Sequence, residues 1–272
     1  MNDNIEIPNS LNERIFEKIK KKYLLDIQPS VSPKGIILGG QPGSGKSFLQ
    51  IEIAKEFTED FIFISTDDLR LYHPAYLELQ QKPETVQNAA NLVNPYASAW
   101  TEKLIKHCIE KNYNLIIDST LGGNIQAVYD TIDMFRSKDF EVHLRVMAVP
   151  AIISKLSIFL RYETQLAEKG FARWTRMEDH DDRFNKLKIN LLEIENTKTP
   201  DSIKFYERVL GVIGTTQLRC LEGFEIKDLG DIEVNSNQLF FMEQMTEKVK
   251  NLIQNRGGEV TDFDKLTIKI KQ

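Results

Sequence analysis

Short apolar runs alternate along the chain with longer stretches in which apolar residues recur every three or four positions. The runs predict buried strands at Ile36–Leu38, Phe61–Ile64, Leu115–Ile117 and Val142–Val149. The periodic stretches predict amphipathic helices at Leu11–Leu25, Ser47–Phe57, Ile152–Glu168 and His180–Asn196. Further helical patterns, long enough for parallel crossovers, lie between the strand candidates. This alternation predicts an α/β fold with a parallel sheet flanked by helices.

The C-terminal part of the chain carries weaker signals. They predict, in order, a short strand at Ser202–Tyr206, a helix at Gln238–Ile253, a turn at Arg256–Glu259 and an edge strand at Leu266–Ile270. We expect one domain over residues 1–223 and a C-terminal extension over residues 224–272 that packs on the same domain. The sequence of the extension does not indicate its role.

Composition and charge narrow the class of protein. The 272 residues are 41% hydrophobic and 28% charged, which predicts a large core and excludes wholesale disorder. The formal net charge of −5 argues against a protein that grips nucleic-acid phosphates over a broad face, so we expect no nucleic-acid partner. A local basic pocket for a small anion is compatible with this balance.

The cysteines and the N-terminus bear on the cellular compartment. Cys108 and Cys220 do not form a C-x-x-C pair, which argues against a disulfide framework and a cysteine zinc site. The histidines, including His73, show no metal-ligand spacing. No apolar run approaches the roughly 18 residues of a membrane span, and the N-terminus does not resemble a signal peptide. We therefore expect a cytoplasmic protein without a membrane partner.

One motif carries specific chemistry. The segment from Gly40 to Ser47 matches G-x-x-x-x-G-K-[ST] and stands between a predicted strand and a predicted helix, as a phosphate-binding P-loop does. The backbone N–H groups of such a loop and the helix dipole attract phosphate oxygens. The residues expected to bind ATP are Gly40, Gln41, Pro42, Gly43, Ser44, Gly45, Lys46 and Ser47.

Two side chains of this loop have predicted roles. Lys46 would neutralise the β- and γ-phosphates, and the Ser47 hydroxyl would ligate Mg²⁺. The alternative is a glycine loop that matches by chance. A dinucleotide site is disfavoured because the loop carries the lysine and lacks G-x-G-x-x-G. The sequence thus predicts a P-loop NTPase or kinase-like domain, either a motor or switch NTPase or a small-molecule kinase.

Two aspartates follow predicted strands and would emerge at the carboxyl edge of the sheet, beside the loop. Asp67 is the candidate general base that takes the proton of an acceptor hydroxyl. Asp118 could orient substrate hydroxyls or hold a Mg²⁺-bound water. Either side chain could instead cap a helix N-terminus, which is the preferred interpretation for the neighbouring Asp68.

Arginines gather around a predicted helical lid at about residues 169–180. Arg161 lies in the helix before it, and Arg173 and Arg176 lie within it. Lid closure would bring guanidinium groups onto the transferring phosphoryl group and exclude water. The alternative for any one of them is a solvated surface charge. Trp174 fits a packing residue better than one that stacks on a base.

Several segments together carry a more specific pattern. They are Gly39 to Ser47, Asp67 with His73-Pro74, Asn94-Pro95-Tyr96, Tyr113 to Thr120, Val146 to Pro150, and Arg161 to Thr164. In order and spacing they resemble the zeta toxins of bacterial toxin–antitoxin systems. The resemblance runs from about Gly35 to about Arg208 and does not extend beyond Gly223.

This resemblance implies a kinase that transfers the γ-phosphate of ATP to a sugar hydroxyl of UDP-N-acetylglucosamine or a related UDP-sugar. It also implies a cognate antitoxin protein that holds the kinase silent. By motif position, Lys46 and Ser47 take phosphate and Mg²⁺, and Asp67 is the base. The implied transition-state contacts are Arg161 and Arg173, and the implied substrate contacts are Glu102, Asp118, Thr120 and Arg176.

The sequence departs from the family pattern at two positions. The family tends to have glutamate where Asp118 stands and arginine where Gly122 stands. A lost arginine is a large change at an anionic ligand, because bidentate charge-assisted hydrogen bonds are strong. We therefore expect the phosphoryl-transfer chemistry to be kept while the preferred UDP-sugar differs.

Two other functions fit the same residues. One is a P-loop kinase for a different acceptor: a nucleoside, a nucleic-acid end or a metabolite. The other is an ATP-binding interaction module without productive transfer. Substitution of Asp67 by asparagine separates the enzymes from the module, because only an enzyme has transfer activity to lose.

Overall fold

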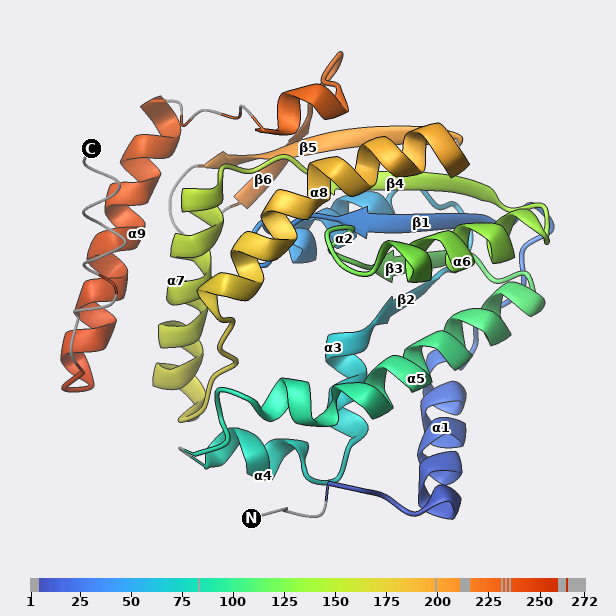
Figure 1. Ribbon diagram of the computed structural model, residues 1–272, viewed down its shortest axis with the longest axis horizontal. Coiled ribbons are helices and arrows are strands. Elements are labelled where there is room, and N and C mark those ends of the chain that lie inside the picture. Colours follow the sequence, from blue (N-terminus) through green and yellow to red (C-terminus); the bar gives the residue numbers. More distant parts are fainter. Residues whose placement is uncertain are drawn as a thin grey trace.

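A six-stranded sheet forms the centre of the computed structural model (Figure 1). The structure describes residues 5–258 apart from 83, 199, 211–215, 231, 233 and 235, and also residue 263. The strands lie in the order β2-β3-β1-β4-β5-β6; the first five are parallel, and β6 is antiparallel to β5. Their bounds are β1 Lys34–Gly39, β2 Ile62–Ser65, β3 Leu115–Asp118, β4 Glu141–Met147, β5 Ser202–Leu210 and β6 Thr216–Cys220.

Helices lie on both faces of this sheet (Figure 1). The longer ones are α1 Asn9–Tyr23, α2 Lys46–Ala54, α5 Ala89–Glu110, α6 Ile125–Arg136, α7 Ala151–Lys169, α8 Met177–Lys198 and α9 Ser236–Asn255. The short ones are α3 Thr66–Leu69, α4 Tyr76–Gln81 and the 3-10 helices η1 Arg70–Tyr72 and η2 Ile226–Gly230.

Strand β1 shows why the central strands are apolar on both sides. Successive side chains of a strand point to opposite faces of the sheet. Ile37 belongs to the core beneath α1, α5, α6 and α8, whereas Ile36 and Leu38 belong to the core beneath α2, α7 and α9. All three side chains are almost fully buried. Because helices cover both faces, the strand reads as a continuous apolar run.

The structure confirms the predicted α/β architecture. All four predicted strands and the four predicted helices are present with shifted ends; α8, for example, begins at Met177 rather than His180. In the C-terminal part, the predicted strand Ser202–Tyr206 lies within β5 and the predicted helix Gln238–Ile253 lies within α9. The predicted turn is present at residues 256–257. The predicted edge strand Leu266–Ile270 lies outside the described residues. Strand β6 was not predicted, because its side chains are mostly exposed and leave no buried-strand pattern.

The carboxyl ends of the parallel strands all open onto one edge of the sheet. The P-loop follows β1, α3 follows β2, and the segment from 170 to 176 joins α7 to α8 at the same edge (Figure 1). Helix α9 packs along α7. Among the residues that the structure describes, no helix combines the length and the apolar character that crossing a membrane would require.

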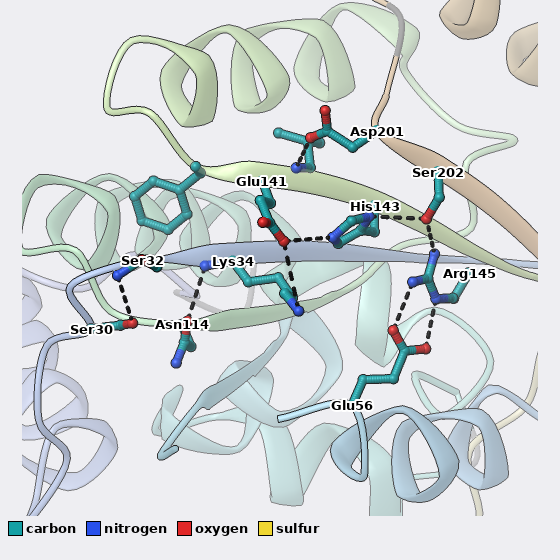
Figure 2. A network of polar contacts seen from close by, with 12 residues as sticks. Ser30, Ser32, Lys34, Glu56, Asn114, Glu141, His143, Arg145, Asp201 and Ser202 are labelled. Atoms are coloured by element: carbon teal, nitrogen blue, oxygen red, sulfur yellow. Dashed lines mark hydrogen bonds and ion pairs between the residues drawn. The ribbon is translucent and has the colours of Figure 1, made fainter. Parts of the chain in front are cut away.

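A polar network around β4 joins the sheet to Glu56, two residues past the end of α2 (Figure 2). Arg145 on β4 is 2% exposed and donates to both carboxylate oxygens of Glu56, at 2.8 and 2.7 Å. It also donates to the hydroxyl of Ser202, at 2.9 Å. Because a buried charge is tolerated only when it is paired, this pair should be important for stability.

Substitution of Glu56 by alanine should lower the free energy of unfolding by about 3 kcal/mol, because it leaves the buried Arg145 guanidinium without its counter-charge. The matched control is Glu52→Ala on α2, which breaks an exposed pair with Lys55 and should cost less than about 1 kcal/mol. Urea unfolding monitored by circular dichroism measures both. Equal losses in the two variants would contradict the assignment.

The same pair should make stability depend on pH. Burial alone would raise the pKa of Glu56, but hydrogen bonding and the charge of Arg145 outweigh burial and hold this pKa below its ordinary value of 4.5. The stability from the pair is therefore complete above about pH 4.5 and is lost as pH falls through the lowered pKa of the folded state. The difference between the wild type and Glu56→Ala should shrink over that acidic range.

Candidate active site

A cleft of about 970 Å³ lies at the carboxyl edge of the sheet. It is lined by the P-loop, α3, α5, the loop after β3, α7, the segment 170–176, and the first turns of α8. Arg208 of β5 and two side chains of α9, Phe241 and Lys248, complete the lining on the other side of the P-loop. A cavity of this size accommodates a nucleotide together with a second small molecule.

The P-loop has the backbone that phosphate binding needs. Gly43 and Gly45 have φ angles of +79° and +102°, in the left-handed region that favours glycine. A Cβ atom built on Gly43 would lie 2.1 Å from the carbonyl oxygen of Ser154, so no side chain fits there. Gly45 is the N-cap of α2 and has no side chain that could occupy the first N–H groups of the helix. These donors are therefore available to an anion.

Six of the eight predicted P-loop residues line the cleft, and Gly40 and Gln41 do not. Gln41 is 1% exposed and its side chain points away, donating to the carbonyl oxygen of Val149 at 2.8 Å and to Ser154 at 3.1 Å. Gly40 lies behind the loop, where its carbonyl oxygen accepts from Nζ of Lys46 at 2.9 Å. Both residues therefore hold the loop in place rather than contact the contents of the cleft.

Lys46 and the two predicted aspartates share this one cleft. Burial lowers the pKa of Lys46, while the carboxylates of Asp118 and Asp67 oppose that shift. A buried ammonium group flanked by carboxylates and backbone donors is suited to a polyanion such as a triphosphate. Lys46 and Asp67 therefore line one cleft, as expected for two residues that follow parallel strands at the carboxyl edge of the sheet.

Asp67 lies between two arginines. Its Oδ1 accepts from Arg70 at 2.5 Å, and its Oδ2 accepts from Arg173. Burial alone would raise the pKa of Asp67, but Arg173 and Arg70 outweigh burial and hold it below its ordinary value. The carboxyl group is therefore ionised at neutral pH and able to accept a proton. The N-cap of α3 is Ser65, so neither Asp67 nor Asp68 is the cap that the sequence allowed.

Asp118 is the last residue of β3, and only one of its carboxylate oxygens has a described hydrogen-bond partner. Its Oδ2 accepts from the hydroxyl of Ser65 at 3.1 Å, whereas its Oδ1 is buried without a hydrogen-bond partner among the described residues. The N-cap of α6 is Asn124, so Asp118 does not cap that helix. Ser47 lines the same cleft. A buried orphan carboxylate oxygen and a hydroxyl are the hard ligands that Mg²⁺ prefers, so these residues fit the ion.

The predicted lid segment lies over the cleft. Arg161 of α7 donates to the hydroxyl of Thr175 at 2.9 Å, and its Nε is buried without a partner among the described residues. Burial and the nearby Arg173 lower the pKa of Arg161 to about 10, so it remains charged at neutral pH. Arg173 extends from the segment to Asp67. Arg161 and Arg173 therefore join Arg70 in the cleft that holds the candidate base.

The other predicted substrate contacts differ in whether they line the cleft. Thr120 lines the cleft; Arg176 lies at the rim, 54% exposed and paired with Asp179. Glu102 is exposed and does not belong to the described lining of the cleft, so the structure does not bring it together with the other predicted contacts. Ser98, one helical turn earlier on α5, does line it, and the extra turn carries Glu102 away. Trp174 packs edge-on against Phe159, although it also touches the cleft.

The cleft residues that sequence reasoning missed include Arg70, Arg183, Arg208 and Phe241. Arg70 follows Asp67 by three positions, a spacing that brings side chains together on a helix and was a usable signal. Arg208 lies with its guanidinium 5.5 Å from the ring of Phe241, and its Nε is buried without a described partner. Strand β5 and helix α9 meet only in the folded chain, so this contact left no local signal.

Comparison with known proteins places the chain in a family. Residues 20–214 match the model of the zeta toxin family. Toxin zeta of Streptococcus agalactiae is 31% identical over 245 residues, covering 88% of this chain and 83% of the relative. Toxin zeta of Enterococcus hirae is 30% identical over 268 residues, covering 97% of this chain and 90% of the relative.

Solved structures show the same fold. A structure from the PezAT chromosomal toxin–antitoxin system of Streptococcus pneumoniae matches with a TM-score of 0.76 and 22% identity, over 93% of this chain and 99% of that one. A structure of AvrRxo1-ORF1:-ORF2 with ATP matches with a TM-score of 0.56 and 11% identity, over 90% and 84%. These matches confirm a P-loop kinase-like fold. Because the family model spans more than half of the sequence and two relatives reach 30% identity over most of it, the chain belongs to the zeta toxin family.

Proposed function

We propose that this protein is the toxin of a toxin–antitoxin pair and a kinase that transfers the γ-phosphoryl group of ATP to a sugar hydroxyl of UDP-N-acetylglucosamine or a related UDP-sugar. Membership of the zeta toxin family supports the toxin role. The observation that carries the kinase chemistry is the meeting of Asp67, Lys46, Arg161 and Arg173 in one cleft beside the P-loop.

The reaction would proceed through this chain's own groups as follows. The acceptor oxygen attacks the γ-phosphorus while its proton passes to a carboxylate oxygen of Asp67. The bond from the γ-phosphorus to the bridging oxygen breaks, and ADP leaves. Lys46 and the N-terminus of α2 bind the phosphate oxygens, and Arg161 and Arg173 face the charge that spreads over the transferring group. Arg173 and Arg70 keep Asp67 ionised at neutral pH, which is the form of the side chain that can take the proton.

Ser47 and Asp118 would hold Mg²⁺ through the Ser47 hydroxyl and the unpartnered Oδ1 of Asp118. When bound, the ion neutralises charge on the β- and γ-phosphates. The phosphate oxygens and water would complete its coordination, as is usual for Mg²⁺.

A sugar acceptor is supported by the polar face of α5. Asn91, Asn94 and Ser98 line the cleft on the side of Asp67. The side-chain oxygen of Asn94 accepts from Arg70 at 2.8 Å, which fixes its orientation. Amide and hydroxyl groups both donate and accept hydrogen bonds, as do sugar hydroxyls. Residues of α9 line the other side, so we infer that the segment after residue 223 belongs to the same nucleotide-binding domain.

An antitoxin protein is the proposed partner. The PezAT structure comes from a toxin–antitoxin system, and the AvrRxo1 structures are complexes of two proteins. An antitoxin that covers the cleft would block ATP directly. We place the pair in the cytoplasm, because Cys108 and Cys220 are both free thiols, as in reducing compartments.

The test is incubation of the purified protein with ATP, Mg²⁺ and a panel of UDP-sugars, followed by mass spectrometry of the small molecules. We expect one UDP-sugar to gain the mass of a phosphate and no gain with Asp67→Asn. The absence of any phosphorylated UDP-sugar, with protein that binds ATP, would refute the proposed acceptor.

A further inference from the structure

The loop after β3 is held in place by α8. Asn190 of α8 donates to the carbonyl oxygens of Leu121 and Gly123, at 2.9 and 3.3 Å. Leu121 is fully buried and has a φ of +53°, a conformation rare for a leucine. A backbone in that region persists only where surrounding contacts impose it. The loop and α8 therefore form one rigid unit at the edge of the cleft.

Within this unit, no side chain can stand at position 122. A Cβ atom built on Gly122 would lie 2.1 Å from the carbonyl oxygen of Arg183 and 2.9 Å from its carbonyl carbon. Backbone atoms cannot move aside as a flexible side chain can. The backbone of α8 therefore occupies the space that a side chain at 122 would need, so a cation at this edge of the cleft cannot come from position 122.

Arg183 supplies that cation. Its Nη1 donates to the carbonyl oxygen of Gly122 at 3.3 Å, and the residue lines the cleft. A Cβ atom built on Gly123 would lie 3.6 Å from the hydroxyl of Thr120 and 3.8 Å from Nη1 of Arg183. The guanidinium group and the hydroxyl thus flank the same point. Arg183 is 38% exposed and bound on one side by Asp182, which leaves further N–H donors for a ligand.

The sheet order assigns this point to the acceptor rather than to ATP. Asp67, the candidate base, follows β2, and Thr120 follows the neighbouring β3. Arg208 belongs to β5, on the other side of the P-loop strand β1, and contacts Phe241 there. The acceptor hydroxyl must lie at Asp67. The molecule that carries it therefore occupies the β2–β3 side, where Arg183 lies.

We propose that Arg183 is a specificity-determining residue that binds the diphosphate of the nucleotide-sugar acceptor, with the Thr120 hydroxyl beside it. This inference rests on the proposed function and deepens it. A guanidinium group held against a rigid loop recognises diphosphate oxygens through paired, charge-assisted hydrogen bonds. The departure from the family pattern at Gly122 then leaves the acceptor with a cation from a different element, one that reaches the cleft from α8.

The test measures binding without turnover. Calorimetry compares UDP, uridine and ATP for the wild type, Arg183→Ala and Arg183→Lys. Arg183→Ala should weaken UDP binding on the order of 10- to 100-fold, the usual effect of losing a hydrogen bond to a charged group. Uridine and ATP binding should change by less than about twofold, because neither involves this contact. The affinity of Arg183→Lys for UDP should lie between those of the wild type and Arg183→Ala, because lysine keeps the positive charge but lacks the paired N–H donors of a guanidinium group.

The matched control is Lys186→Ala. Lys186 lies one turn further along α8, pairs with the same Asp182 at 2.6 Å, and does not belong to the described lining of the cleft. It should leave UDP binding unchanged. Thermal melts should show all three variants folded, since these side chains are partly exposed and their ion pairs add little stability. An equal loss in Lys186→Ala, or an equal loss of ATP binding in Arg183→Ala, would overturn the assignment.

Failure of this inference differs from failure of the proposed function. If the wild type phosphorylates a UDP-sugar and Arg183→Ala does so with an unchanged KM, only the role of Arg183 is wrong. If the wild type neither binds UDP nor phosphorylates any UDP-sugar, the proposal of a UDP-sugar acceptor is wrong. The proposed contact between Arg183 and the diphosphate is then wrong as well. A KM for the UDP-sugar that rises with little change in kcat supports both.

Discussion

Replacing Asp67 with asparagine is expected to lower kcat by about 10²- to 10⁴-fold, the usual contribution of a positioned general base. The amide keeps the shape of the side chain but cannot take the proton of the acceptor hydroxyl. ATP should still bind, because the P-loop and Lys46 supply the phosphate contacts. Single-turnover phosphorylation of the UDP-sugar gives the rate, and a fluorescent ATP analogue gives the affinity.

The neighbouring carboxylate provides a matched control. Asp68 follows Asp67 in α3 but is exposed and does not belong to the described lining of the cleft. Asp68→Asn should therefore keep nearly full activity. A similar loss in both variants would mean that the charge of α3, and not the proton acceptor, is what matters. Full activity in Asp67→Asn would rule out the base role of Asp67.

The P-loop and the two aspartates were predictable because their signals are local. A G-x-x-x-x-G-K-[ST] segment between a strand and a helix defines both the loop and its surroundings. Asp67 and Asp118 were found because residues that follow parallel strands meet at one edge of the sheet. The order of strands was not needed for either step. Local pattern and parallel topology together therefore placed the P-loop side of the cleft.

The side of the cleft formed by α5 and α8 was less predictable, because it depends on where helices lie relative to one another. Glu102 and Ser98 stand on the same face of α5, and only the position of the helix decides that Ser98 reaches the cleft and Glu102 does not. Arg183 reaches it because α8 packs on the loop after β3, a contact between residues about 60 positions apart. Hydrophobic periodicity predicted that helix but carries no information about its neighbour.

The sequence also did not predict the direction in which a side chain of the motif points. Gln41 occupies a variable position of the P-loop pattern, and the pattern treats it as part of the phosphate site. In the structure it is buried against Val149 and Ser154, where it fixes the loop to α7. A motif gives spacing along the backbone, whereas the partner of each side chain depends on the fold around it.

Substitution of Arg173 by alanine is expected to lower kcat by about 10³-fold, the lower end of the range for an arginine that contacts a transferring phosphoryl group. Arg173 has two partners in this scheme, Asp67 and the phosphoryl group. Because it also lowers the pKa of Asp67, its loss should raise that pKa. In a plot of kcat against pH, the fall in kcat on the acid side should therefore move to higher pH in Arg173→Ala. A merely structural role of Arg173 would not produce this shift.

The double variant Asp67→Asn/Arg173→Ala tests whether the two groups act as a unit. If Arg173 orients Asp67 as well as contacting the phosphoryl group, its orienting contribution is already lost in Asp67→Asn. The combined loss in kcat should then be smaller than the product of the two separate losses. Arg173→Lys should recover part of the activity, because a lysine restores the charge without the paired donors. A combined loss equal to the product would mean that the contact between Asp67 and Arg173 has no part in the transfer step.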